Sequence, residues 1–384
     1  MVGIKAQSKS TKHEVVIVGG GLAGLVSSIL LSRSGIDVLL IEAKTYPFHR
    51  VCGEYISNEV IPFLEANDLF PHELGPSKIE RLTVSAISGR SFSTMLDLGG
   101  FGISRFVFDL WLVEKARESG VTVLEHTKVT EVDYVDSQFL ITTDKEGTFQ
   151  SQLVLGAQGK RSKLDKSLSR DFINHRSPYV GVKYHIKADF PDDLIALHNF
   201  HGGYCGISQI EDGKHNLCYL THRDQVKKYG NIPEFERQVM WQNPHLREIL
   251  KGSEQLWEKP EVINEISFEK KEPVHNHILL AGDAAGMITP LCGNGMAMAI
   301  HGAKVLSEII IENQSEKGFD LEKIEQEYTL AWNKLFSNRL WAGRQIQKTL
   351  FGNNLASETA IFTGKYLKSI TETLISKTHG TPFS

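Results

Sequence analysis

Apolar and polar residues near the start of the chain follow a pattern that predicts a strand, a helix and a second strand. Residues 15–18 are consecutive β-branched apolar residues, which is typical of a buried parallel strand. Apolar residues then recur at helical spacing from Leu22 to Leu30, and Gly35 is a suitable end for that helix. Residues 38–42 read Val-Leu-Leu-Ile-Glu and predict the next strand. This order of elements is a βαβ unit.

The rest of the chain alternates between strand-like and helical periodicity. Residues 105–119 predict a helix that Gly120 ends, and residues 278–281 predict a late return to a buried parallel strand. Residues 139–142 lie in an alternating pattern that suggests a hairpin. Further strand patterns occupy residues 79–102, 121–124 and 153–156. The late strand implies that the domain begun at the N-terminus is discontinuous.

A different pattern fills the middle and the end of the chain. Residues 180–188 and 216–221 alternate like strands of an antiparallel sheet, and residues 224–251 form a polar stretch that predicts helix. Beyond about residue 314 the chain is predicted to be helical and amphipathic. One stripe there contains Trp332, Phe336, Leu340 and Trp341. Such a stripe is typical of core or subunit packing.

A glycine-rich turn joins the first strand to the first helix. The glycines allow a sharp turn and a close approach to a pyrophosphate, while the helix directs its free N–H groups at the phosphates. Glu42 ends the next strand, where a carboxylate accepts hydrogen bonds from ribose hydroxyls and disfavours a 2′-phosphate. The alternative is a glycine turn of some other α/β protein. The expected nucleotide-binding residues are Gly19, Gly21, Leu22, Ala23, Gly24 and Glu42.

A second glycine-rich segment, residues 282–286, follows the late strand. The first segment alone indicates a dinucleotide. The two segments together indicate FAD, with both turns meeting in space around one molecule.

Composition narrows the class of protein. The chain has 384 residues, enough for about two domains. Its net charge of −4, with both signs mixed, gives no sign of nucleic-acid binding. No apolar run is long enough to span a bilayer, and residues 1–12 lack the apolar core of a signal peptide. We therefore expect a soluble cytoplasmic enzyme.

Cysteine and histidine usage argues against disulfide and metal frameworks. The cysteines are widely scattered and form no Cys-x-x-Cys pair, so they are expected to be reduced thiols. Two histidine pairs, His198 with His201 and His275 with His277, have no matching partner cluster, and no metal site is expected. The cysteines are Cys52, Cys205, Cys218 and Cys292.

With these motifs in place, the sequence resembles the FAD-dependent reductases and hydroxylases that share the fold of p-hydroxybenzoate hydroxylase. Within that superfamily it is similar to the geranylgeranyl reductase branch. The resemblance covers roughly residues 13–315. It rests on the first glycine turn with Glu42, on Arg-Val-Cys-Gly-Glu at 50–54, on Arg105 ahead of a helix, and on residues 282–296.

The resemblance implies an α/β fold with a Rossmann-like, glutathione reductase-type FAD-binding domain. A mainly antiparallel β-sheet substrate domain is inserted into it, and a helical region follows. The FAD-binding domain is expected over 11–80, 103–166 and 270–315, the substrate domain over 81–102 and 167–269, and the C-terminal helical region over 316–384.

Further cofactor contacts follow from the resemblance. Asp283 matches the aspartate that hydrogen-bonds the ribityl chain. The segment Gly293, Asn294, Gly295 and Met296 opens a helix whose N-terminus faces the pyrimidine edge of the flavin, where it stabilises the negative charge of the reduced ring. Arg50 and Arg105 resemble arginines on the phosphate and ribityl side; the alternative for either is a surface ion pair.

Cys52 and Glu54 lie in a segment that is close to the flavin in the reductase branch. Cys52 could contact the ring or assist proton delivery to the substrate, and the alternative is an inert packed thiol. Glu54 is expected to be merely solvated.

The sequence departs from the superfamily at three places. Gln158 occupies the position of an aspartate that serves FAD and the passing nicotinamide in hydroxylases, which places direct NAD(P)H reduction in doubt. Residues 202–209 replace the aromatic and proline-lysine segment of the reductases, leaving Tyr204 and Ile207 as expected substrate-pocket residues. The Trp-x-Trp-x-x-Pro segment of halogenases is absent, so halogenation is disfavoured.

The expected function is therefore FAD-dependent oxidation–reduction of a lipophilic or aromatic small molecule, in the manner of a geranylgeranyl reductase. Three alternatives remain open: a monooxygenase using NAD(P)H and O₂, a non-redox flavoprotein cyclase or isomerase, and a protein that keeps the fold for binding or electron transfer without its own small-molecule chemistry. The expected partners are the small-molecule substrate and an electron-donor protein, with NAD(P)H as a transient reductant and peripheral membrane contact both left open.

Overall fold

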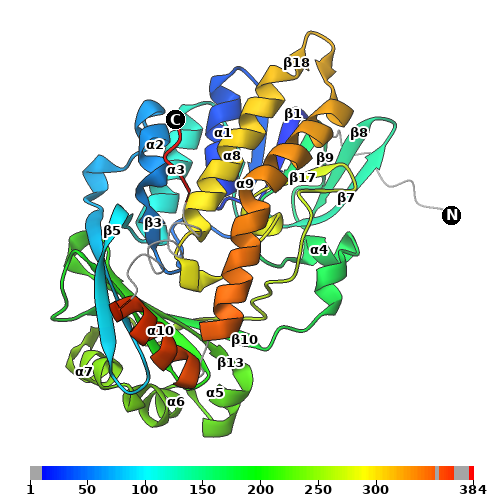
Figure 1. Ribbon diagram of the computed structural model, residues 1–384. Helices are drawn as coiled ribbons and strands as arrows, with labels where there is room; N and C mark the ends of the chain where they lie inside the picture. The colour runs from blue at the N-terminus through cyan, green and yellow to red at the C-terminus, as the bar shows by residue number, and fades with distance from the viewer. Residues whose placement is uncertain (1–10, 351–353, 367–379) are drawn as a thin grey trace.

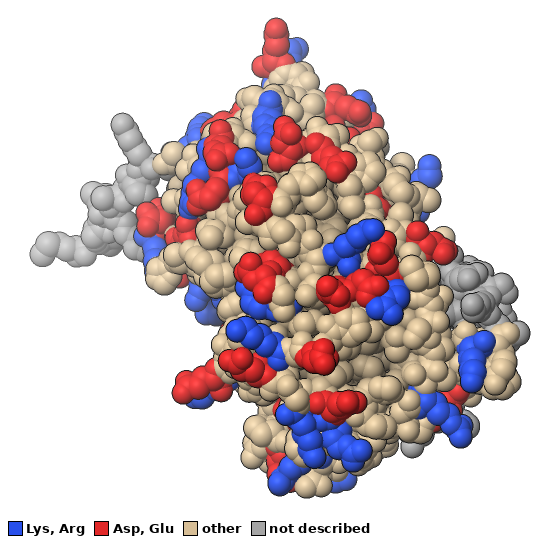
Figure 2. Space-filling view, turned by 90° about the vertical axis from the view of Figure 1, so that its left-hand side faces the viewer, with Lys and Arg blue, Asp and Glu red and all other residues tan. Residues whose placement is uncertain are grey.

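The computed structural model describes residues 11–350, 354–366 and 380–384. Two sheets dominate these residues, one mainly parallel and one mainly antiparallel, and they lie one above the other in Figure 1. Acidic and basic side chains are interspersed over the face shown in Figure 2. In this part of the chain no helix is long and apolar enough to cross a membrane.

The parallel sheet confirms the α/β fold class expected from the sequence. Its strand order, β17-β9-β1-β2-β6, brings the late strand β17 to within one strand of β1. The strands are β1 (Thr11–Val18), β2 (Val38–Ile41), β6 (Thr122–Leu124), β9 (Thr148–Gly156) and β17 (Ile278–Leu280), with β16 (Val274–His275) antiparallel at one edge. The hairpin β7 (Val129–Val135) and β8 (Gln138–Thr143) extends it through β9.

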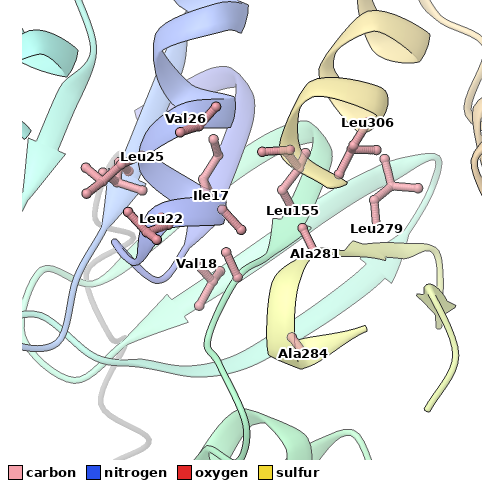
Figure 3. Close-up of a cluster of buried hydrophobic side chains, with 14 of the residues drawn as sticks. Ile17, Val18, Leu22, Leu25, Val26, Leu155, Leu279, Ala281, Ala284 and Leu306 are labelled. Carbon is pink, nitrogen blue, oxygen red and sulfur yellow. The ribbon is translucent and has the colours of Figure 1, made fainter. Parts of the chain in front are cut away.

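The helices α1 (Leu22–Arg33) and α8 (Gly295–Glu312) cover this sheet and contact each other. Figure 3 shows apolar side chains of β1, β9 and β17 meeting those of both helices, among them Ile17, Leu155, Leu25 and Leu306. A third helix, α3 (Arg105–Glu118), contacts α1. The strands that precede these helices, β1 and β17, are parallel and separated only by β9, so both helices begin on the side of the sheet where these strands end.

The second sheet has the order β14-β10-β13-β12-β11-β4-β5-β3, with β15 also paired to β10. Residues 11–80, predicted to belong to the FAD-binding domain, contain β3 and the start of β4. Both of these strands pair with β5 in this second sheet. The strands are β3 (Tyr55–Ser57), β4 (Ser77–Ser85), β5 (Ser91–Gly102), β10 (Tyr179–Lys187), β11 (Leu194–Phe200), β12 (Gly203–Gln209), β13 (His215–His222), β14 (Glu254–Gln255) and β15 (Glu261–Asn264).

One face of the second sheet is covered by helices. The predicted helical stretch 224–251 is three short helices, α5 (Arg223–Tyr229), α6 (Ile232–Gln238) and α7 (Pro244–Gly252). The chain breaks after α5 because Gly230 adopts φ +85°, and Pro244 starts a new helix at its first position. Shorter elements are α2 (Ile61–Ala66), α4 (Lys163–Ser167), β18 (Gln314–Ser315) and β19 (Gly318–Phe319).

The C-terminal part contains α9 (Leu321–Leu350), which packs along α8, and α10 (Asn354–Tyr366), which contacts β4 and β5 (Figure 1). Trp332, Phe336 and Leu340 are buried as a stripe, but Trp341 is 61% exposed. The prediction was wrong for Trp341 because it follows Leu340 directly and therefore points about 100° away from the stripe. Residues 351–353 and 367–379 of the predicted region 316–384 lie outside the described residues.

Candidate functional site

The two glycine-rich turns meet in the folded chain. Both follow strands of the parallel sheet, β1 and β17, with only β9 between them. A Cβ built on Gly282 would lie 3.2 Å from the Cβ of Ala23, the second residue of α1. The turns are thus in direct contact, which is required if both of them are to bind one dinucleotide.

The glycines of the first turn serve two different purposes. Gly19 adopts φ +104°, and a Cβ on Gly24 would lie 2.0 Å from the carbonyl oxygen of Gly19. The chain's own packing therefore requires those two glycines. Gly21 is different, because its built Cβ has only the Arg105 guanidinium within 4 Å, at 3.6 Å. The space in front of Gly21 is open, as a close approach by phosphate requires.

Two helix N-termini face this region. The N-cap positions are Gly21 for α1 and Asn294 for α8, and neither helix has a side-chain cap or an acidic residue in its first turn. The positive ends of both helix dipoles are therefore not neutralised locally. A Cβ on Gly295 would find only Ile288, at 3.8 Å. The open glycine, the uncapped helices and the nearby guanidinium together fit the pyrophosphate and flavin of FAD.

A network of charged groups lies beside the first turn; we call Glu42, Arg50, Arg105 and Asp109 the glycine-turn network. Glu42 accepts a hydrogen bond from the Gly20 N–H at 2.8 Å, which fixes its carboxylate at the end of β2. Asp109 accepts two bonds from Arg105, at 2.6 and 2.8 Å, and a third from Arg50 at 3.0 Å. Asp109 is buried, so both predicted arginines are bonded to a carboxylate inside the protein and not to one at the surface.

Cys52 lies in a loop between the two sheets. Asn216 of β13 donates to the carbonyl oxygens of Cys52 and Gly53, at 3.1 and 2.8 Å. Lys183 of β10 donates to the carbonyl oxygen of Arg50 at 3.1 Å. Two strands of the antiparallel sheet therefore hold the backbone of this loop from one side.

Glu54 is fully buried, which corrects the expectation that it is solvated. Its Oε1 accepts from the Lys183 ammonium at 2.5 Å and from the Arg105 N–H at 2.8 Å. Its Oε2 lies 2.7 Å from Nε2 of His185. Glu54, Lys183, His185 and Asn216 form what we call the Cys52-loop network. Such pairing is needed because an unpaired charge in this interior would be strongly unfavourable.

The surroundings set the protonation states of the loop. Burial raises the pKa of the Cys52 thiol, and this effect exceeds the opposing influence of the Arg105 charge. Burial would also raise the pKa of Glu54, but Lys183 and His185 lower that pKa to about 2. At neutral pH the site therefore holds a protonated thiol beside an ionised carboxylate.

Asp283 of the second turn lies beside two lysines. Lys271 is buried and donates to the backbone carbonyl oxygens of Asp283 and Lys160, both at 2.7 Å. Burial lowers the pKa of Lys271 and of Lys160 to about 8 in each case, although Asp283 opposes the shift. Burial also raises the pKa of Asp283. The carboxyl group expected to bind the ribityl chain thus lies beside two lysines whose pKa values are closer to neutral pH than usual.

The remaining predicted residues occupy separate places. Gln158 donates to Asp165 at 3.1 Å and supplies no charge of its own. Tyr204 belongs to an apolar cluster with Leu220 and Ile266, whereas Ile207 packs in the cluster that contains residues of α6. The expectation that Tyr204 and Ile207 line one pocket is corrected, since side chains alternate along β12 and these two point to opposite faces.

Sequence reasoning missed Asp109, Lys183, His185, Asn216 and Lys271. Two signals were available. Asp109 lies four residues after Arg105 on the predicted helix, the spacing at which side chains meet. Lys183 and His185 alternate with apolar residues in the strand 180–188, which indicates a charged face within an interior strand.

Comparisons with known proteins agree with this geometry. The family described as FAD binding domain matches residues 12–67 and 107–321, more than half of the chain. The digeranylgeranylglycerophospholipid reductase of Methanosarcina acetivorans is 25% identical over 84% of this chain and 81% of its own. Two solved structures share the fold. The flavin-dependent brominase Bmp2 has a TM-score of 0.76 and 19% identity, covering 96% of this chain and 94% of its own. A geranylgeranyl bacteriochlorophyll reductase-like protein from Thermoplasma acidophilum has a TM-score of 0.70 and 17% identity, covering 94% and 98%.

These findings confirm the expected superfamily and its FAD cofactor. The family match covers both glycine turns, and those turns are in contact in the structure. The chain belongs to the FAD-binding domain family, and it is a FAD-dependent oxidoreductase.

Proposed function

We propose that this oxidoreductase is a reductase that saturates a carbon–carbon double bond in a lipophilic small molecule. The observation that carries the proposal is the position of the Cys52 loop, whose backbone carbonyl oxygens accept from Asn216 of β13, together with burial that keeps the Cys52 thiol neutral. FAD, when bound and reduced, supplies the hydride equivalent for such a reaction. The second hydrogen arrives as a proton, and we assign its donation to the neutral Cys52 thiol. Solvent protons then restore the thiol.

The protein's own residues also suit an apolar substrate. The cluster of Tyr204, Leu220 and Ile266 includes the partly buried Met287 and Leu291, which belong to the loop between the two segments expected to contact FAD. Such a surface binds apolar groups and excludes water from them. The reductase name of the Methanosarcina acetivorans relative supports the same class of reaction.

We further propose that the electrons come from a donor protein in preference to NAD(P)H. The neutral Gln158 is bonded to Asp165, which already accepts from Arg170 at 2.9 Å. This position therefore lacks the free carboxylate expected of a nicotinamide-using hydroxylase.

Peripheral membrane contact is supported by exposed aromatic side chains of α9 and α10, which are Trp341, Phe362 and Tyr366.

The test is an anaerobic incubation of the FAD-loaded protein, reduced with dithionite, with a lipid that carries isolated prenyl double bonds. We expect a product heavier by two hydrogen atoms, together with return of the oxidised flavin spectrum. An oxygenated product that forms only in air would instead establish the monooxygenase. Isomerised product without consumption of reductant would establish the non-redox enzyme. Parallel reductions with NADPH and with a ferredoxin identify the electron donor.

A further inference from the structure

A cavity of about 400 Å³ lies where the start of β10, the stretch before β16 and the C-terminal half of α9 come together. Its volume is within the range of small-molecule sites. None of the residues expected to contact FAD or to donate the proton lines it. The cavity is therefore separate from the glycine turns and the Cys52 loop.

The rim of this cavity is positively charged. Arg176, Lys270, Arg344 and Lys348 all line it, and Glu269 is the one carboxylate among its lining residues. Within the described ranges, none of the four cations has a carboxylate within ion-pair distance. Unpaired cations around a concave surface attract and concentrate anions. This arrangement favours a ligand with a negatively charged group.

The wall of the cavity contains a buried polar group without a partner. Gln347 is 3% exposed, and its Oε1 has no hydrogen-bond partner among the described residues. A buried acceptor left unsatisfied is unfavourable. A hydroxyl or acid O–H on the bound molecule would satisfy it. This buried acceptor is independent of the cationic rim and also points to a polar ligand group.

Part of the lining is apolar and belongs to a larger apolar cluster. The rings of Tyr179 and Phe268 line the cavity with their centroids 5.6 Å apart. Both belong to the cluster that contains Tyr204, Met287 and Leu291. An apolar strip therefore connects the cavity to the loop between the two segments expected to contact FAD.

We propose that this cavity binds the anionic end of an amphiphilic substrate. The phosphate or carboxylate contacts Arg176, Lys270, Arg344 and Lys348, and a neighbouring hydroxyl contacts Gln347. The apolar part of the substrate lies along Tyr179 and Phe268. The inference rests on the proposed function, because it names the chemical class of that substrate.

Calorimetric titration of the FAD-loaded protein with octyl phosphate, kept below its micelle concentration, tests the proposal. We expect Arg344→Glu to weaken binding about tenfold, since it removes one charge-assisted contact and adds repulsion. Lys348→Glu, one turn further along α9, should act in the same direction. The matched control is Lys334→Glu, which reverses an exposed charge of α9 outside the cavity and should leave affinity unchanged. Thermal unfolding establishes that each variant is folded.

Two comparison probes complete the test. Octyl glucoside has the same chain without the charge, and inorganic phosphate has the charge without the chain. Equal affinity for octyl glucoside and octyl phosphate, or equal losses in Arg344→Glu and Lys334→Glu, would overturn the anionic site. Inorganic phosphate binding as tightly as octyl phosphate would overturn the apolar wall. Because these are binding measurements, failure of the reductase assay with intact octyl phosphate binding would overturn only the proposed function.

Discussion

The glycine-turn network and the Cys52-loop network meet at Arg105, whose backbone N–H donates to Glu54, and they are built in different ways. In the first, Arg105 and Asp109 are four residues apart on one helix. In the second, Glu54 is 129 residues from Lys183 and 131 from His185. The central pair of the first network is therefore local in sequence, and Arg50 joins it from 59 residues away. The second network forms only when the antiparallel sheet closes over the loop.

This contrast suggests different tasks for the two networks. Arg50 in the glycine-turn network is 29% exposed, and the Arg105 guanidinium faces the open space at Gly21, so both cations can reach a ligand. Glu54 and Lys183 are fully shielded, so they can only hold protein parts together. A buried ion pair is weak evidence for added stability, but breaking one by removing a single partner is costly. We therefore assign cofactor binding to the first network and loop positioning to the second.

The largest expected effect is on FAD binding, from Gly21→Val. A valine side chain would fill the open space in front of Arg105 where the pyrophosphate is expected, and affinity for FAD should fall by more than about a hundredfold. The purified protein should be colourless yet folded, as read by visible absorbance and circular dichroism. Gly252→Val is the control, since a Cβ there meets nothing within 4 Å. A yellow Gly21→Val protein would remove the glycine turn from the cofactor site.

Glu54→Gln should lower the free energy of unfolding at neutral pH by about 3–5 kcal/mol, because Lys183 would lose its buried counter-charge. Urea titration measures this change. Glu80→Gln, which removes the carboxylate of an exposed pair with Lys78, should cost less than about 1 kcal/mol. Similar losses in the two variants would contradict the assignment of the Cys52-loop network.

The same variant should change how stability depends on pH. The pKa of Glu54 is lowered in the folded protein from 4.5 to about 2, so its contribution is complete above about pH 4.5. That contribution is lost as the pH falls towards 2. Glu54→Gln should lack this part of the acid destabilisation. The groups facing Glu54 are Lys183, His185 and the backbone N–H of Arg105. Glu54→Gln leaves all three residues in place, so the change in pH dependence reports on Glu54 itself.

The same contrast explains how far the sequence predicted the structure. Strand and helix periodicity, with glycines and Glu42 in register, was enough for the parallel sheet and its first turn. Glu54 could not be predicted as buried, because its partners Lys183 and His185 lie 129 and 131 residues away in sequence and one chain gives no sign of that pairing. Ile207 was misplaced for a related reason, since the face of β12 that looks towards the FAD-binding sheet depends on strand register. Trp341 was wrongly assigned to the buried stripe because apolar residues were counted without regard to their angle around the helix.

Cys52→Ala tests what the Cys52-loop network positions. Loss of the proton donor should slow reduction of the substrate about a hundredfold while FAD affinity is kept. Single-turnover reoxidation of the reduced protein by substrate measures this step. Cys218→Ala is the matched control, because Cys218 is a neighbouring thiol whose pKa burial raises to about 12. Equal slowing in both variants would argue for altered packing and against proton donation by Cys52.

The smallest expected effect tests whether the two networks act separately where they meet, at Arg105. Asp109→Asn keeps the shape of the side chain but removes the charge that fixes Arg105 and Arg50, so FAD should bind about tenfold more weakly. The Glu54 carboxylate accepts from the backbone N–H of Arg105, not from its guanidinium, so this bond should persist and leave the pH dependence of unfolding unchanged. Glu114→Gln, in an exposed pair with Arg117 on the same helix, is the control. Flavin release measured with an unchanged acid-unfolding profile would show that the networks act independently. A shift in both would show that Arg105 couples cofactor binding to the Cys52 loop.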